Sequence, residues 1–196
     1  MPDAAAPPSS PDAQLLMAAA SGDVDGVSRA LAAGAALESR DMRGRSALLL
    51  AVADDHLAVA QLLVACGADP NALDAATDAG CKPWRVVAEA LLPAGPDMTL
   101  RNRYGGISVI PASERGHVEY VRRVVRTGID VDHVNDLGWT ALLEAVILGD
   151  GSPPYQEIVG ILLAAGADPL LADRQGVTAL QHARALGHHS LAALLS

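Results

Sequence analysis

Leucine-rich apolar runs alternate with short polar segments along the chain, and each of the five clearest runs ends at a glycine. The glycines lie in the fragments AAGAALE, ACGADPN, PAGPDMT, RTGIDVD and AAGADPL, at Gly34, Gly67, Gly95, Gly128 and Gly166. An acidic or amide residue follows each glycine seven positions later, at Asp41, Asp74, Asn102, Asn135 and Asp173. Both series have successive intervals of 33, 28, 33 and 38 residues. Two anchors with one spacing indicate an internal repeat, with one unit five residues short and another five long.

The residues within a unit predict a turn followed by two helices. An Asp or Asn three residues before a glycine is typical of a tight turn. Hydroxyl residues then stand where they can cap a first helix, at Ser46, Thr140 and Thr178, and Ile107 replaces the hydroxyl in one unit. In RGHVEYVRRVV the first helix ends at Gly116, and a second begins with apolar residues at helical spacing. The later glycine caps that second helix in the left-handed conformation. A single unit cannot bury its own apolar face, so neighbouring units must stack.

The spacing predicts one continuous all-α domain over residues 12–196, preceded by a disordered arm over 1–11 that is rich in Pro, Ser and Ala. Its six units are 12–40, 41–73, 74–101, 102–134, 135–172 and 173–196. In unit 74–101 the first helix would have to fit within AATDAGCKP, so we expect an irregular loop there. This loop is either a tolerated deletion or a dent in which a ligand could sit.

The long unit, 135–172, carries its five extra residues between its two helices. Aligning Gly149 with Gly116 leaves the segment DGSPP, residues 150–154, as the surplus. A turn between helices can lengthen without disturbing the stack. The segment is therefore either a longer loop or a finger that contacts a partner.

Composition narrows the class of protein. Apolar residues make up 51% of the chain, aromatics only 3%, and Phe is absent, so the core must consist of Ala, Leu and Val. A net charge of −9 disfavours binding to nucleic acid or to anionic membranes. Cys66 and Cys81 form no CxxC pair, which favours a reducing compartment, and Cys66 is expected to be buried. No signal peptide or membrane span is recognisable, so we expect a soluble cytoplasmic protein.

No enzyme motif is present, and no catalytic residue, cofactor or metal is expected. His56, His117 and His188 share one position of the repeat, where we expect the imidazole to bond backbone of the neighbouring unit. The pair His188–His189 lacks the further ligands that a metal needs. Glu114, Glu144 and Asp150 with His133 could suggest acid–base chemistry, but they lie on different units and nothing in the sequence marks a raised pKa.

The repeat resembles the ankyrin repeat, whose unit runs D-x-x-G-x-T-P-L-H-x-A, then G-H-x-x-V-V-x-x-L-L-x-x-G-A-D. The segments NRYGG, RGHVE and LGWTALLEAVILGDG are most similar to stand-alone bacterial ankyrin proteins. The tetrapeptide T-P-L-H appears only as SALL, ISVI, TALL and TALQ, so the histidine tie between neighbouring turns is expected to be missing. The resemblance implies a solenoid of about six helix-turn-helix units. It also implies a non-enzymatic module that binds proteins.

In this architecture the turns and first helices line a concave face, and a polar and aromatic set falls on it. The set is Arg103, Tyr104, Glu114, His133, Asp136, Trp139 and Glu144. Trp139 either covers Gly106 of the neighbouring turn or anchors a partner, since Trp, Tyr and Arg dominate interface energetics.

We therefore expect a monomer that binds an unidentified protein or peptide, with no nucleic acid or membrane partner. Two alternatives remain open. One is a small-molecule or metal-binding sensor that uses the irregular third unit, and the other is a bacterial effector that acts on a host protein.

Overall fold

The structure, a computed structural model, describes residues 10–71 and 90–196. These residues form helices and turns, with no strand beyond the isolated bridges Arg40–Ser46 and Ala172–Thr178. The all-α prediction is therefore confirmed. The chain divides into two compact units, residues 1–96 and 97–196, and each is described by itself.

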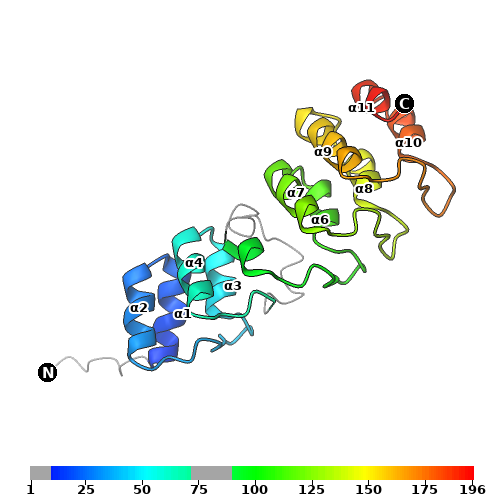
Figure 1. Cartoon of the computed structure of the whole chain (residues 1–196). Helices are drawn as coiled ribbons and strands as arrows, with labels where there is room; N and C mark the ends of the chain where they lie inside the picture. The colour runs from blue at the N-terminus through cyan, green and yellow to red at the C-terminus, as the bar shows by residue number, and fades with distance from the viewer. Residues whose placement is uncertain (1–9, 72–89) are drawn as a thin grey trace, which may run out of the picture. The chain divides into compact units, whose positions relative to one another are not determined.

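The first compact unit holds two helix pairs and a short 3-10 helix. Its elements are α1 (Pro11–Ser21), α2 (Val24–Ala32), α3 (Ala47–Ala53), α4 (Leu57–Ala65) and η3 (Leu92–Ala94). α1 packs against α2 and α3, and α3 packs against α4 (Figure 1). The side chains of Leu15, Val27 and Leu63 are fully buried among these helices.

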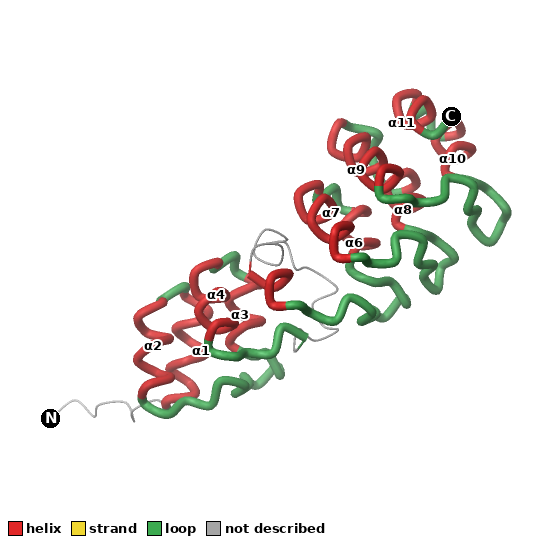
Figure 2. The backbone as a smooth tube through the Cα atoms, in the orientation of Figure 1, coloured by secondary structure: helices red, strands yellow, loops and turns green. Residues whose placement is uncertain are grey.

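The second compact unit holds three helix pairs. Its elements are α6 (Val109–Glu114), α7 (Val118–Val124), η4 (Val125–Thr127), α8 (Ala141–Ile147), α9 (Pro153–Ala164), α10 (Ala179–Ala185) and α11 (His189–Leu194). The first helices pack in the order α6, α8, α10, and the second helices in the order α7, α9, α11. The long turns that join one pair to the next extend on the same side of this unit (Figure 2).

The described helix pairs coincide with five of the six predicted units. The predicted irregular stretch of the unit 74–101 falls mainly on residues 72–89, outside the described residues, as do residues 1–9 of the predicted arm. The helix α1 already begins at Pro11, with Ser10 as its N-cap. One continuous domain over residues 12–196 stays a prediction.

Local capping follows the sequence closely. The hydroxyls of Ser46 and Thr140 accept hydrogen bonds from the backbone N–H three residues later, and Thr178 forms a full capping box with Gln181. Where Ile107 replaces the hydroxyl, α6 has no side-chain cap. Ala, Leu and Val make up most of the core, as the composition predicted, and four isoleucines and Tyr120 are buried with them. The prediction of a buried Cys66 is wrong, because this residue follows the last turn of α4 and is exposed.

The predicted tight turns share one hydrogen-bonding pattern. In the turn at Asn135, the side-chain Oδ1 accepts from the N–H groups of Leu137 and Trp139, both at 3.0 Å. The backbone N–H of Asn135 donates to the carbonyl of Trp139. The same bonds recur in the turns that open with Asp41, Asn102 and Asp173. One side chain thus holds two backbone donors, so the shape of the turn is set mainly by its own residues.

At the far end of two pairs, α3–α4 and α8–α9, a ring side chain bonds the backbone of the preceding unit. His56 Nε2 lies 3.1 Å from the carbonyl oxygen of Ala20, which confirms the predicted bond across units. In the long unit Tyr155 takes this place, and its hydroxyl donates to the carbonyl of Glu114 at 3.0 Å. Its ring packs on Gly116, as His56 packs on Gly22. The ring of His188 packs on Gly151 but makes no hydrogen bond within residues 10–71 and 90–196, so the predicted bond is wrong for this residue.

Only three of the five extra residues belong to the turn between the two helices. Asp150, Gly151 and Ser152 form the turn, whereas Pro153 and Pro154 are the first residues of α9. Proline is well tolerated in the first turn of a helix, because its missing N–H has no partner there. The insertion lengthens α9 and positions Tyr155 over the neighbouring unit.

We expect Tyr155→Phe to lower the free energy of unfolding by about 0.5–1.5 kcal/mol, because the hydrogen bond to Glu114 is lost while the ring remains. Urea unfolding measures this difference. Tyr104→Phe is the matched control, since the Tyr104 side chain is 46% exposed and its hydroxyl holds no other element of the described chain. Equal losses in the two variants would show that the Tyr155 hydroxyl does not stabilise the stack.

Candidate functional site

The seven candidate residues all lie in the second compact unit, on its turns and first helices. Arg103, Tyr104, His133 and Asp136 lie on two consecutive turns, and Trp139 ends the second turn. Glu114 and Glu144 lie on the first helices α6 and α8.

Tyr104 contacts residues of both turns. The Arg103 guanidinium carbon lies 4.9 Å from the centre of the Tyr104 ring, within the range of a cation–π contact. The backbone N–H of Asp136 donates to the Tyr104 carbonyl at 2.8 Å. The Asp136 carboxylate covers Gly105, where a Cβ would lie only 2.5 Å from Oδ1. A side chain on Gly105 would therefore displace the Asp136 carboxylate from its present position.

A histidine from another position of the repeat also joins these turns. His133 Nε2 donates to the carbonyl of Gly105 at 2.7 Å, so it carries the proton in the neutral ring. The tie comes from the residue two positions before the turn, a place that the T-P-L-H comparison does not cover. The next turn continues the stack, since Arg174 packs on Gly138 and donates to the carbonyl of Asp136.

Trp139 is half-buried at the end of its turn, and its backbone N–H donates to Oδ1 of Asn135. The atoms nearest to a Cβ on Gly106 belong to Asn102 of the same turn, the first at 3.4 Å. Gly106 is thus covered first by its own turn, and covering it does not by itself account for the tryptophan.

Glu144 is buried in the middle of α8, with 5% of its surface exposed. Asn135 Nδ2 donates to its Oε1 at 2.7 Å. Burial, followed by the nearby negative charge of Glu114, raises the pKa of Glu144 to about 7, while the Asn135 hydrogen bond and the Arg115 charge oppose this rise. Nothing in the sequence had marked this raised pKa, because its causes lie in the packing of α8 and in the charge of another unit.

The same pairing recurs one unit later with the roles exchanged. His182 Nε2 lies 2.7 Å from Oδ2 of Asp173, and both pairs join a turn residue to the helix residue nine positions later. In the first pair the amide of Asn135 on the turn donates to the carboxyl of Glu144 on the helix. In the second pair the carboxylate of Asp173 is on the turn and the imidazole of His182 is on the helix. The sequence contained this signal in the shared spacing of nine. Glu144 thus supports the turn, and its burial leaves little surface for contact with a partner.

Glu114 is the last residue of α6 and half-buried. Its Oε2 lies 3.9 Å from Arg115 Nε, and its carbonyl accepts the Tyr155 hydroxyl. In residues 10–71 and 90–196 no three His, Cys, Asp or Glu side chains are placed to hold a metal ion. Within the same ranges no helix is long and apolar enough to cross a membrane. The arrangement offers aromatic, basic and acidic groups on stiff turns.

We expect Glu144→Gln to remove one pH-dependent loss of stability. The native pKa of about 7 exceeds the ordinary 4.5, so the unfolded chain releases this proton first as pH rises. The wild-type free energy of unfolding therefore falls between about pH 4.5 and pH 7 and stays lower above that range. Near pH 8 the variant should be more stable by at most about 3 kcal/mol.

Chemical unfolding at a series of pH values, with wild type and variant compared at each, isolates this group from all others. Asp54→Asn is the control, because it removes one carboxylate from an exposed position directly after α3. Parallel stability profiles for wild type and Glu144→Gln would contradict the prediction.

The comparisons with known proteins agree with this geometry. A family model of ankyrin repeats in three copies matches residues 75–173, and a single ankyrin repeat model matches residues 43–75. The ankyrin repeat protein YahD of Escherichia coli strain K12 is 38% identical over 93% of this chain and 94% of its own length.

Two solved structures are similar over nearly their whole length. An ankyrin repeat domain from Acinetobacter baumannii AYE is 43% identical with a TM-score of 0.82, covering 92% of this chain and 95% of that one. The ankyrin repeat protein EF0377 is 34% identical with a TM-score of 0.83, covering 94% and 96%. The hydrogen-bonded turns, the paired helices and these matches show that the chain belongs to the ankyrin repeat family.

Proposed function

We propose that this chain is a non-enzymatic module that binds a protein or peptide through the turns and first helices of residues 97–196. Ankyrin repeats are generally protein–protein interaction modules, which gives the class of function. The proposal further assigns the contact surface to Arg103, Tyr104, Asp136 and Trp139, with Glu114 at its edge. His133 and Glu144 hold the two turns in position beneath it. The protein acts as a monomer in the cytoplasm.

One observation carries the proposal: large apolar side chains are exposed on the turns of this unit. They are Leu100 (51%), Tyr104 (46%), Val134 (51%), Leu137 (48%) and Leu170 (78%). All five belong to the segments that join one helix pair to the next, and contiguous exposed apolar groups are typical of interaction sites. Apolar and aromatic side chains beside arginine and acidic groups are suited to an interface with an apolar centre and a polar rim.

The stiffness of the turns supports the same function. Each turn is held by its own Asp or Asn and is joined to its neighbour by backbone hydrogen bonds, such as that from Asp136 to Tyr104. A surface that is already ordered loses little conformational entropy on binding, so a few anchors suffice. The net charge of −9 favours a partner with a neutral or basic surface and disfavours nucleic acid.

We expect the double variant Tyr104→Ala/Trp139→Ala to lose partners that the wild-type chain recovers. Each anchor contributes about 2 kcal/mol to binding, or roughly a thirtyfold change in affinity. The measurement is quantitative affinity capture with tagged wild type and variant, followed by titration of the recovered protein.

Leu148→Ala/Leu186→Ala is the matched control, because these leucines are 48% and 49% exposed but follow the C-terminal ends of α8 and α10, away from the turns. All three proteins are first shown to unfold at comparable temperatures. Equal recovery by the wild type and the Tyr104/Trp139 variant would rule out the turn surface as the binding site.

A further inference from the structure

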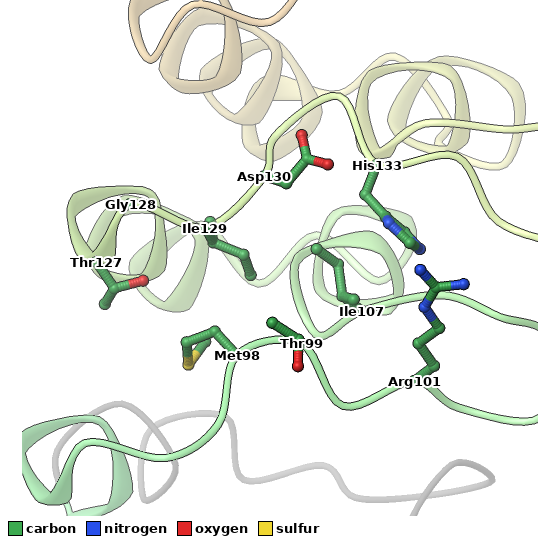
Figure 3. Close-up of a pocket in the computed structure, with 9 residues that line it drawn as sticks. All are labelled: Met98, Thr99, Arg101, Ile107, Thr127, Gly128, Ile129, Asp130 and His133. Carbon is green, nitrogen blue, oxygen red and sulfur yellow. The ribbon is translucent and has the colours of Figure 1, made fainter.

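A pocket with a volume of about 320 Å³ lies in the second compact unit, between residues 98–101 and the loop 127–133 (Figure 3). Ile107 and Ile129 contribute apolar walls and are only 4% and 8% exposed, and the half-buried Met98 adds a third. This volume falls at the lower end of the range of small-molecule sites. The pocket is therefore large enough for a compact aliphatic group.

The polar side of the pocket is basic. The side chains of Arg101 and His133 point toward one another at its edge (Figure 3). Within residues 10–71 and 90–196 Arg101 makes no hydrogen bond or ion pair. In the first compact unit Arg40 occupies the same repeat position, and its guanidinium donates to the carbonyl of Gly44 at 2.8 Å. Arg101 is thus not needed to hold its own turn, and its five N–H donors remain available.

Neither neighbouring polar group neutralises this arginine. The Asp130 carboxylate accepts the N–H of Asp132 at 3.1 Å, and its side chain points away from Arg101 (Figure 3). His133 donates Nε2–H to the carbonyl of Gly105, so its neutral ring adds no charge to oppose or replace that of the guanidinium.

We propose that this pocket binds a small aliphatic carboxylate. The carboxylate accepts hydrogen bonds from the Arg101 guanidinium, whose planar fork matches two carboxylate oxygens, and it lies beside His133. The aliphatic part of the ligand packs against Met98, Ile107 and Ile129. The site goes beyond partner binding, because it takes a free small molecule.

The chemistry of the walls selects a monoanion over a phosphate. A single unpaired guanidinium matches one negative charge, and three apolar side chains supply no donors for further anionic oxygens. The protein carries a net charge of −9, which repels a multiply charged ligand more strongly than a singly charged one.

The test is a titration of the full chain with sodium isocaproate, followed through backbone amide chemical shifts. Isocaproamide is the control ligand, since it has the same shape without the charge. We expect saturable shifts with isocaproate at Thr99, Ile129 and His133, and affinity for the amide weaker by about ten- to a hundredfold.

Two variants separate the two halves of the site. Arg101→Gln should reduce the affinity for isocaproate to that for isocaproamide. Because Arg101 is exposed, we expect this variant to keep the fold, which its backbone N–H chemical shifts will check. Met98→Ala should weaken both ligands alike. Arg184→Gln removes an exposed charge from the last turn of α10, outside the pocket, and should bind as the wild type does.

Three results would each overturn the proposal: no saturable shift with isocaproate, equal affinity for the acid and the amide, or unchanged affinity in Arg101→Gln. The titration contains no protein partner, so its outcome is independent of the turn surface at Tyr104 and Trp139.

Discussion

The stacking of helix pairs is the constraint on which the structure depends, since no pair can bury its own apolar surface. The helix α8 shows the consequence most clearly. It packs against α6, α9 and α10, and every residue from Ala141 to Val146 is buried. Small side chains such as Ala141 and Ala145 allow this close approach from several sides. A carboxyl in such a helix is necessarily desolvated, so the raised pKa of Glu144 follows directly from the stacking.

Apolar packing is not directional, so specific hydrogen bonds set the register between units. At one end of the pairs the Asp or Asn of each turn holds two N–H groups, and neighbouring turns are joined through Asp136 and His133. At the other end His56 and Tyr155 bond the carbonyls of Ala20 and Glu114. The insertion in the fifth repeat keeps this second tie, because Pro153 and Pro154 extend α9 and bring Tyr155 to the place that a histidine holds in other units.

Features determined by neighbouring residues in the chain could be predicted from the sequence. The caps at Ser46, Thr140 and Thr178 and the turn bonds of Asp41 and Asn135 need only a few consecutive residues. Their spacing was sufficient to identify the repeat and the helix pairs. Features that depend on the adjacent unit were missed or misjudged.

The missed features have a common physical origin. Tyr155 acts through the carbonyl of a residue 41 positions earlier, and Glu144 is affected by a charge 30 positions away. Cys66 was expected to be buried because it precedes a capping glycine, yet burial at a helix end depends on what the next unit places there. The pocket at Arg101 likewise depends on two loops brought together by folding, and no local pattern marks it.

Repeat architecture separates structural from functional positions within each turn. The first Asp or Asn and the glycine three residues later are the same in kind in all four described turns, because the turn bonds require them. The positions between and beside them differ from unit to unit. Trp139 corresponds to Arg45, Gly106 and Val177, and Arg101 corresponds to Arg40, Val134 and Ala172. In the first of these turns Arg40 and Arg45 bond Gly44 and Asp41 of their own turn. The bonds common to all four turns use only the Asp or Asn and the backbone, so the side chains at these two positions can differ between units. The tryptophan and the unpaired arginine occur at positions where recognition chemistry can change without loss of the fold, and this separates them from Glu144 and Tyr155, which the stack itself uses.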